Sequence, residues 1–239
     1  MKKITRKTFV LLATLAFAVL ATTAAFAAAV NYNLFGDAQL VSPGYNSPTA
    51  AQIRSDSAIA PQYGGVDFVI PSGLTVADLD TLSTDYKFVT GTCGGGSPRF
   101  QVNVIDPNDN QTKNIFFYLG TAPNYTGCAP NVWSNTNNLA AGTNLVDATQ
   151  IGGSFYMPYS DVQATYGTYE IVGIQIVVDA YWSGGTQTTQ VDNVHINNLT
   201  YTFESADSCK KGGYLQFTSA PGPFANQGQC VSYFAKGGQ

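Results

Sequence analysis

Alternation of apolar and polar side chains is the feature that most constrains the fold of this 239-residue chain. In the run RFQVNVI (residues 99–105), Phe100, Val102 and Val104 occupy every second position, and polar or charged residues precede each of them. This period of two belongs to a β-strand with one buried face. A second run, YEIVGIQIVVDA (residues 169–180), is predicted to form a strand with one wholly apolar face, made by Val172, Ile174, Ile176 and Val178. Such strands need an apolar layer on their buried side, so the chain is expected to build packed sheets.

Strand-like runs separated by Gly, Pro and Asn turns follow one another through the chain. Further strands are predicted at 66–70, 86–90, 114–120 and 199–204. The runs 169–180 and 186–197 flank the turn YWSGG (181–185), and we expect them to pair as a long hairpin. The one helix-like segment, 75–86, is expected to form only a short turn. The prediction is an all-β fold: a two-sheet antiparallel, jelly-roll-like sandwich over 28–205, followed by a small separate element over 206–239.

The first 27 residues have the pattern of a secretory signal peptide. Basic residues precede an apolar run from Phe9 to Leu20, and Ala25-Phe26-Ala27 suits signal peptidase, so we expect cleavage after Ala27. No later segment approaches the roughly 20 apolar residues of a membrane helix. The mature chain keeps seven of the eleven basic residues and all fifteen acids, a formal charge of −8. We therefore expect a secreted or cell-surface protein with no membrane span, and the charge argues against nucleic acid as a partner.

Four cysteines in an exported chain are expected to form two disulfides, because that compartment allows thiols to oxidise. Of the three connectivities, we favour the sequence-local one, Cys93 with Cys128 and Cys209 with Cys230. No Cys-x-x-Cys occurs, and the only histidine, His195, lies outside both segments that the cysteine pairs enclose, 93–128 and 209–230. Both observations disfavour zinc and redox chemistry. The segment between the last two cysteines, 209–230, is interpreted as a loop closed by a disulfide.

Residues for catalysis are few. Glu170 and Glu204 are the only glutamates, and a glycosidase would have to use an Asp pair that spacing alone does not reveal. His195 is the only imidazole, and we interpret it as a hydrogen-bonded strand residue. The loop DPNDN (106–110) resembles the start of a calcium loop but has Gln111 where an EF-hand needs glycine, so it is interpreted as a hairpin turn.

Aromatic residues in turn-rich segments are the best candidates for ligand binding. Tyr181 and Trp182 stand beside SGG at the expected hairpin tip, and Tyr125 and Trp133 flank Cys128. Flat sugar faces stack on such rings, although the same residues also close the ends of sandwich cores. Arg99, at the start of a strand, is a candidate for gripping a carboxylate or sugar hydroxyls, with a surface ion pair as the alternative.

Several segments together resemble a known group of proteins. They are LTVADLDTLSTDYKF, CGGGSPRFQVNV, FFYLG, VVDAYW and VDNVHINNLTYTFE. This set is similar to a group of exported bacterial proteins whose body resembles jelly-roll carbohydrate-binding modules. The tail CKKGGYLQF…FANQGQCVSYF resembles a C-terminal signature found on otherwise different exported bacterial proteins. Because such modules often hold a structural calcium ion, the resemblance implies Asp179 and Asp192, on strands expected to pair, as candidate ligands; no other cofactor is expected.

Three functions stay open at this point. The first is a non-catalytic exported protein that binds carbohydrate or another cell-surface polymer. The second is a structural or adhesive surface protein that self-assembles through strand edges or the stapled tail. The third is an unrecognised carbohydrate-active enzyme.

Overall fold

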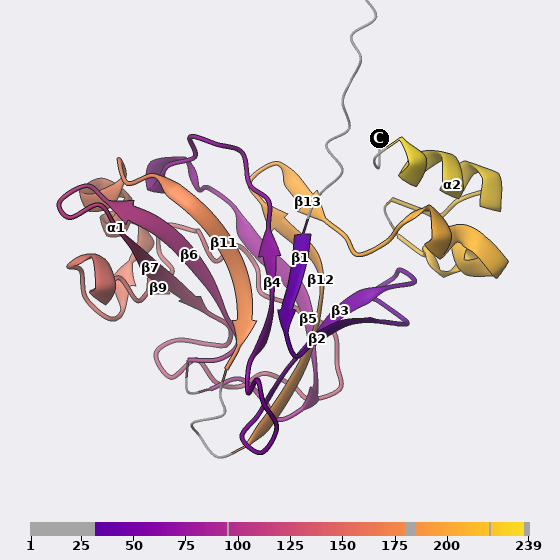
Figure 1. The fold of residues 1–239 in the computed structure, drawn as a ribbon, viewed down its shortest axis with the longest axis horizontal. Coiled ribbons are helices and arrows are strands. Elements are labelled where there is room, and N and C mark those ends of the chain that lie inside the picture. Colours follow the sequence, from indigo (N-terminus) through magenta and orange to yellow (C-terminus); the bar gives the residue numbers. More distant parts are fainter. Residues whose placement is uncertain (1–31, 95, 180–184, 220, 237–239) are drawn as a thin grey trace, which may run out of the picture.

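Two antiparallel sheets packed face to face make up the body of the protein. The computed structural model describes residues 32–94, 96–179, 185–219 and 221–236. Sheet A has the strand order β1 (Tyr32–Gly36), β4 (Gly64–Phe68), β11 (Ile171–Val178), β6 (Arg99–Asp106) and β7 (Gln111–Tyr118). Sheet B has the order β2 (Ala38–Val41), β3 (Ala50–Asp56), β12 (Thr186–Ile196), β5 (Leu82–Thr90) and β8 (Ser134–Asn135), with β13 (Leu199–Tyr201) also on β12. Figure 1 shows β4, β11 and β6 side by side, with β12 and β5 in the layer behind them.

The chain passes from one sheet to the other between most consecutive strands. The strands β3, β4, β5 and β6 alternate between sheets B and A, and so do β11 and β12, whereas β6 and β7 form a hairpin within sheet A. This wrapping is that of a jelly roll, and the predicted fold class is confirmed. The expected long hairpin of 169–180 with 186–197 is wrong. β11 pairs with β4 and β6, and β12 pairs with β3 and β5, so the two strands belong to different sheets.

The core lies between the sheets and follows the predicted alternation on β6. Phe100, Val102 and Val104 are fully buried. On β11 the predicted four-residue apolar face is wrong at its first member, because Val172 is 48 % exposed and Ile171 is buried instead. A register shift between Ile171 and Gly173 moves the side chains before it to the opposite face.

Short helices close the ends of the sandwich. The segment 75–86 contains η1 (Val76–Asp78) and the start of β5, as expected of a short turn. The unpredicted helix α1 (Tyr159–Tyr166) packs against η1, and the buried Tyr159 hydroxyl donates to the Val76 carbonyl at 3.0 Å. A second single turn, η2 (Thr149–Ile151), lies beside β7, and β9 (Leu145–Val146) pairs with β10 (Met157–Pro158).

The turn at 106–110 joins β6 to β7, as interpreted from the sequence. The Asp106 carboxylate accepts a hydrogen bond from the Asn108 backbone N–H at 2.9 Å. Lys113 forms ion pairs with Asp106 and Asp109. This turn therefore uses its acids to hold its own backbone and the neighbouring lysine.

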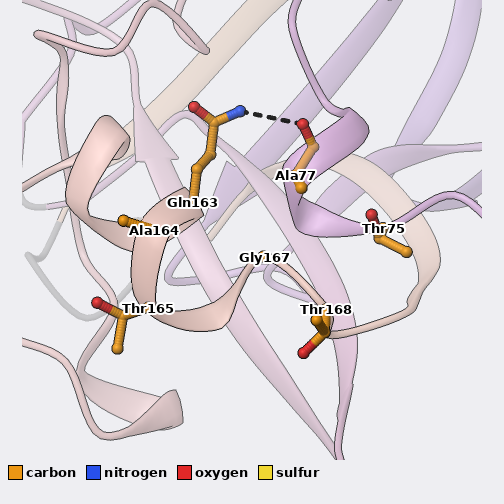
Figure 2. A pocket seen from close by; sticks show the side chains of 7 residues that line it. All are labelled: Thr75, Ala77, Gln163, Ala164, Thr165, Gly167 and Thr168. Atoms are coloured by element: carbon orange, nitrogen blue, oxygen red, sulfur yellow. Dashed lines mark hydrogen bonds between the residues drawn. The ribbon is translucent and has the colours of Figure 1, made fainter.

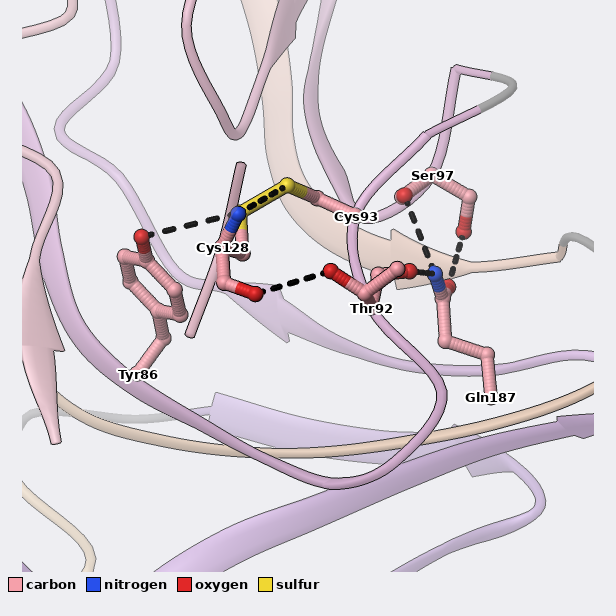
Figure 3. Close-up of a disulfide and its surroundings, with 6 residues drawn as sticks. All are labelled: Tyr86, Thr92, Cys93, Ser97, Cys128 and Gln187. Carbon is pink, nitrogen blue, oxygen red and sulfur yellow. Dashed lines mark hydrogen bonds between the residues drawn. A yellow bond between two sulfur atoms is a disulfide. The ribbon is translucent and has the colours of Figure 1, made fainter. Parts of the chain in front are cut away.

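The two disulfides join Cys93 to Cys128 and Cys209 to Cys230, the sequence-local pairs. The first lies in the body beside Tyr86, whose hydroxyl is 3.7 Å from the Cys128 sulfur (Figure 3). On its other side, the Gln187 amide donates to the Thr92 carbonyl at 2.7 Å. The bridge thus ties the loop after β5 to the segment 120–131.

The C-terminal segment has a core of its own. It comprises η4 (Ala206–Gln216), which is kinked at Lys210–Gly212, and α2 (Gln227–Ala235). Its buried residues Cys209, Phe217, Phe224 and Cys230 form a cluster separate from that of the sandwich. Thr218 donates its N–H to the Asn46 carbonyl at 3.1 Å and so links the segment to the body. Figure 1 shows this segment set apart from the two sheets. Within the described residues, no helix has the length and apolar character needed to cross a membrane.

Candidate binding site

A row of polar side chains crosses the outer face of sheet A. Strand register aligns Asn33 with Asp67, Asp67 with Gln175, and Gln175 with Gln101. Gln101 is in turn aligned with Phe116 on β7, so the row ends in an aromatic ring. We call these five residues row A. None of them belongs to the core cluster, because their neighbours in sequence carry the buried side chains.

The length of row A follows from the spacing of strands. Neighbouring strands lie about 4.8 Å apart, so five aligned positions span roughly 19 Å. Asn33 and Asp67 are exposed, and the glutamines are half-buried. Burial raises the pKa of Asp67 above its ordinary value. Row A therefore offers amide donors, carbonyl acceptors and one carboxylate in a line of that length.

Arg99 lies beside this row and is held on three sides. Its guanidinium makes a two-pronged ion pair with Asp179, with N–O distances of 2.6 and 2.7 Å. It donates to the Gly96 carbonyl at 3.0 Å and lies 4.9 Å from the centre of the Phe116 ring. The surface ion pair named as the alternative for Arg99 is present. The same contacts fix its orientation next to row A.

Four aromatic rings form a ridge at the β7 edge of sheet A. The rings of Tyr118 and Tyr125 lie 4.8 Å apart, and that of Tyr125 stacks on Tyr156 at 5.9 Å. Phe155 contacts Tyr118 at 5.8 Å and Tyr156 at 4.4 Å. Phe155 and Tyr156 are each 42 % exposed, whereas Tyr118 and Tyr125 are buried. The ridge thus presents two accessible rings on a buried aromatic base.

The backbone at the ridge is unusual for large side chains. Tyr125 has a φ of 49° and Tyr156 a φ of 63°, in the left-handed region that side chains with a Cβ seldom occupy. Such conformations cost free energy and persist where the surroundings hold them, often at functional sites. Here they bring two rings from separate loops into a stack.

The hydroxyls of the two buried ridge residues, Tyr118 and Tyr125, stay protonated at neutral pH. Burial raises the pKa of Tyr125 to about 12, and its hydroxyl donates to the Leu145 carbonyl at 3.0 Å. Burial, and then the bond from its hydroxyl to Asp147 at 2.9 Å, raise the pKa of Tyr118 well above its ordinary value. These two hydroxyls therefore hold the ridge in place.

The ligand-binding residues predicted from the sequence do not all lie at one place in the structure. Arg99, Asp179 and Tyr125 lie at this end of sheet A, connected through Phe116 and Tyr118. Trp133 lies on the outer face of sheet B, against Tyr45. Tyr181 and Trp182 fall in 180–184, outside the described residues, directly after Asp179. Sequence reasoning missed Phe155 and Tyr156; their position after the glycines of GGSFY, in a turn, is the signal that was available.

The two calcium candidates lie in different sheets, so their expected placement on paired strands is wrong. Asp179 follows β11 and faces Arg99, whereas Asp192 is in β12. Asp192 is fully buried and accepts hydrogen bonds from the Tyr45 N–H at 2.8 Å and the Ser47 hydroxyl at 2.9 Å. In the described part of the chain, no three His, Cys, Asp or Glu side chains lie close enough to hold a metal ion.

The remaining catalytic candidates are also engaged. His195 is hydrogen-bonded to Thr200 on β13 at 3.0 Å, as interpreted from the sequence. Asp192 lies near Glu204, and burial followed by this neighbouring charge raises the pKa of Asp192 to about 7. Burial likewise raises the pKa of Glu204. Asp192 is fully buried beneath the β2–β3 loop, and half-buried Glu204 accepts a hydrogen bond from the Thr49 N–H of that loop at 3.2 Å.

A hollow between η1 and α1 is a further concave feature (Figure 2). It is lined by small or neutral side chains, and Gln163 reaches across it to the Ala77 carbonyl at 3.5 Å. Its lining residues are Thr75, Ala77, Gln163, Ala164, Thr165, Gly167 and Thr168. The hollow lacks the aromatic and charged groups that distinguish the outer face of sheet A.

Comparison with known proteins identifies no family. No family model matches the chain, and no curated protein matches it either. Among solved structures, one described as an exo-beta-agarase matches with a TM-score of 0.35 and 14 % identity, over 72 % of this chain and 24 % of that one. The chain thus spans about a quarter of that protein. Similarity at this level supports neither an activity nor a substrate for this chain.

Proposed function

We propose that the protein is an exported, non-catalytic binder of carbohydrate or of another hydroxyl-rich cell-surface polymer, and that the polymer lies along row A. The observation that carries this proposal is the alignment of amide and carboxylate side chains across five strands, ending at Phe116. Sugar hydroxyls need paired donors and acceptors, and sugar ring faces stack on aromatic rings.

The surroundings of row A support the same function. Arg99 and Asp179 satisfy each other's charge, so they hold a hydrogen-bonding edge in place without a net charge. The exposed rings of Phe155 and Tyr156 extend the aromatic end of the row. A rigid surface of this kind loses little conformational entropy when a polymer binds, which favours affinity.

Two arguments favour binding over catalysis. Asp192 is buried beneath the β2–β3 loop and Glu204 is half-buried beside it, while on the open face Arg99 and Asp179 form an ion pair. General acid–base chemistry requires a titratable group within hydrogen-bond reach of the reacting atom. The Asp179 carboxylate is engaged by Arg99, so it is not free to act with Asp67 as a glycosidase pair.

The tail supports a second candidate, docking of a partner or retention at the cell surface. Residues 206–239 hold three lysines and one acid, while 28–205 hold four basic residues and fourteen acids. A basic element with its own core, joined to an acidic body, is suited to dock on an anionic envelope polymer or on another copy.

The test of the proposed function is a glycan array probed with the mature chain. The informative variant is Gln101→Ala with Gln175→Ala, which removes the two central amides of row A; the matched control is Gln163→Ala in the hollow beside α1. We expect binding that the control retains and the double variant loses by at least tenfold. Equal binding by the double variant, with an unchanged melting temperature, would contradict the proposal.

A further inference from the structure

Sheet B carries a second row of polar side chains on its own outer face. Register aligns Gln39 with Gln52, Gln52 with Gln190, and Gln190 with Lys87. The next position, on the segment that pairs with β5, is Trp133, and the Lys87 ammonium lies 5.0 Å from the centre of its ring. We call these five residues row B. Like row A, row B has three amides and one charged side chain on neighbouring strands and ends at an aromatic ring.

The groups of row B have unfilled hydrogen-bonding capacity. The Gln190 side-chain NH₂ donates to the Gln52 side-chain Oε1 at 3.4 Å, which is a long hydrogen bond. The Gln190 Oε1 is itself buried without a partner in the described chain. Among the described residues, no carboxylate lies within ion-pair distance of Lys87. A buried acceptor without a partner costs free energy, and the half-buried Lys87 ammonium has donors without a carboxylate partner, so a hydroxyl-bearing ligand has groups to bond here.

A loop makes a wall along one side of row B. Residues 42–49, between β2 and β3, lie against β12 because Asp192 accepts hydrogen bonds from Tyr45 and Ser47. The Tyr45 ring then packs on Trp133 at 5.4 Å. Row B is therefore bounded by the loop, with two rings at the corner where the loop meets β8.

We propose that row B is a second polymer-binding site, and that the protein holds two polymer chains at once, one on each outer face. This inference rests on the proposed function of row A. Because the sheets pack face to face about 10 Å apart, their outer faces point in opposite directions. One polymer segment lying along row A does not reach row B, so the two sites act on separate chains and cross-link them. The ligand class is a hydroxyl-rich polysaccharide at both faces.

Binding stoichiometry tests this inference directly. The full mature chain is titrated by calorimetry with cellohexaose, xylohexaose and hexaguluronate as probes. We expect two sites per protein for at least one probe. Gln101→Ala with Gln175→Ala removes one of them, Gln52→Ala with Gln190→Ala removes the other, and the four substitutions together remove both.

Three results overturn the inference, and they are distinguishable. If the titration finds a single site that the row A substitutions abolish and the row B substitutions leave unchanged, the proposed function stands and the row B site is refuted. If none of the probes binds, both proposals are refuted. If there is a single site that only the row B substitutions abolish, binding at row A is refuted, and so is the simultaneous binding of two polymer chains.

Cross-linking is the second readout, with Gln163→Ala, outside both rows, as the control. The wild-type protein is expected to make a solution of soluble xylan or cellulose ether turbid, and the row B variant is expected to bind without turbidity. Unchanged melting temperatures separate loss of binding from loss of fold. Turbidity that persists in the row B variant would contradict the proposed bivalency.

Discussion

The two outer faces are built by the same rule and differ in what lies over them. On sheet A the face is open, and its central amides are half-buried only by their neighbours in the sheet. On sheet B the loop 42–49 covers one end of the face and buries Asp192. Strand alternation decides which side chains point outward, whereas a loop decides which of them stay accessible. The covered face also contains the acids whose ionisation is least favourable.

The largest expected difference between the faces is a pH dependence of stability that comes mainly from sheet B, where Asp192 has the larger pKa shift. The pKa of Asp192 is raised to about 7 in the folded protein from 3.8, and that of Glu204 is raised as well. The folded state therefore binds more protons than the unfolded state in this range, and stability is lost as the pH rises from about 4 through 7. A shift of this size sets an upper limit of about 4 kcal/mol.

The measurement is denaturant unfolding at pH 5 and pH 8, with Asp192→Asn as the variant. We expect wild-type stability to be lower at pH 8, and the variant to flatten this slope. Asp106, whose pKa is lowered to about 2 mainly by its bond with Lys113, acts in the opposite direction at lower pH. A wild-type slope that Asp192→Asn leaves unchanged would show that the covered acids are not its source.

Adding a methyl group under the loop is the next largest perturbation. A Cβ at Gly44 would lie 2.3 Å from the Ser47 hydroxyl and 2.4 Å from the Thr49 carbonyl, so Gly44→Ala must displace the loop. We expect a loss of about 1–3 kcal/mol in unfolding free energy, as for other overpacked sites. The matched control on the open face is Gly173→Ala, whose Cβ would meet only the Asn103 side-chain amide at 3.0 Å. Equal losses for both variants would mean that the faces are equally constrained.

Removing the C-terminal segment tests the same contrast with a smaller effect. A chain that ends at Ser205 is expected to fold, because the sandwich core ends at Phe203 and the segment 206–236 has its own cluster. Its bonds to the body, between Thr218 and Asn46, involve the loop of the covered face. We expect ligand binding at row A to be unchanged and any change to be confined to row B. An insoluble product would show that the segment is part of the sandwich fold.

The smallest effect is expected from the charge pair on the open face. Asp179→Asn leaves Arg99 with its bond to Gly96 and its position over Phe116. Because both side chains are partly exposed, we expect a cost below about 1 kcal/mol in stability. Affinity for glycan should fall more than stability, since Arg99 then keeps only two of the three contacts that fix its orientation beside row A. A large fall in melting temperature with unchanged affinity would assign the pair a purely structural role.

Much of the open face was predictable from the sequence, and the covered face was not. The alternation in RFQVNVI correctly places Gln101 outward and Phe100 inward, because nothing interrupts the pairing of β6. On β12 the expected alternation puts Val191 and Val194 on opposite faces. Both are buried in the core, because a register shift between Asp192 and His195, with Asn193 at a φ of 46°, reverses it.

Other features depend on contacts between distant segments. Rows A and B require the register of five strands each, which no local pattern contains. The strands β11 and β12 were expected to pair because of the turn between them. A turn shows where the chain reverses and leaves open which strand becomes its partner. The tyrosine stack of Tyr125 and Tyr156 likewise joins loops that are far apart in sequence.

The side-chain amides of the two rows are the most direct probes of the central claim, since glutamine NH₂ groups give separate NMR signals. In a titration of the mature chain with the best oligosaccharide from the array, we predict shifts at Gln101 and Gln175 on one face and at Gln52 and Gln190 on the other. The Gln163 amide, in the hollow beside α1, is predicted to stay unchanged. Shifts confined to Gln163 and its neighbours, with both rows unchanged, would contradict binding along the sheet faces.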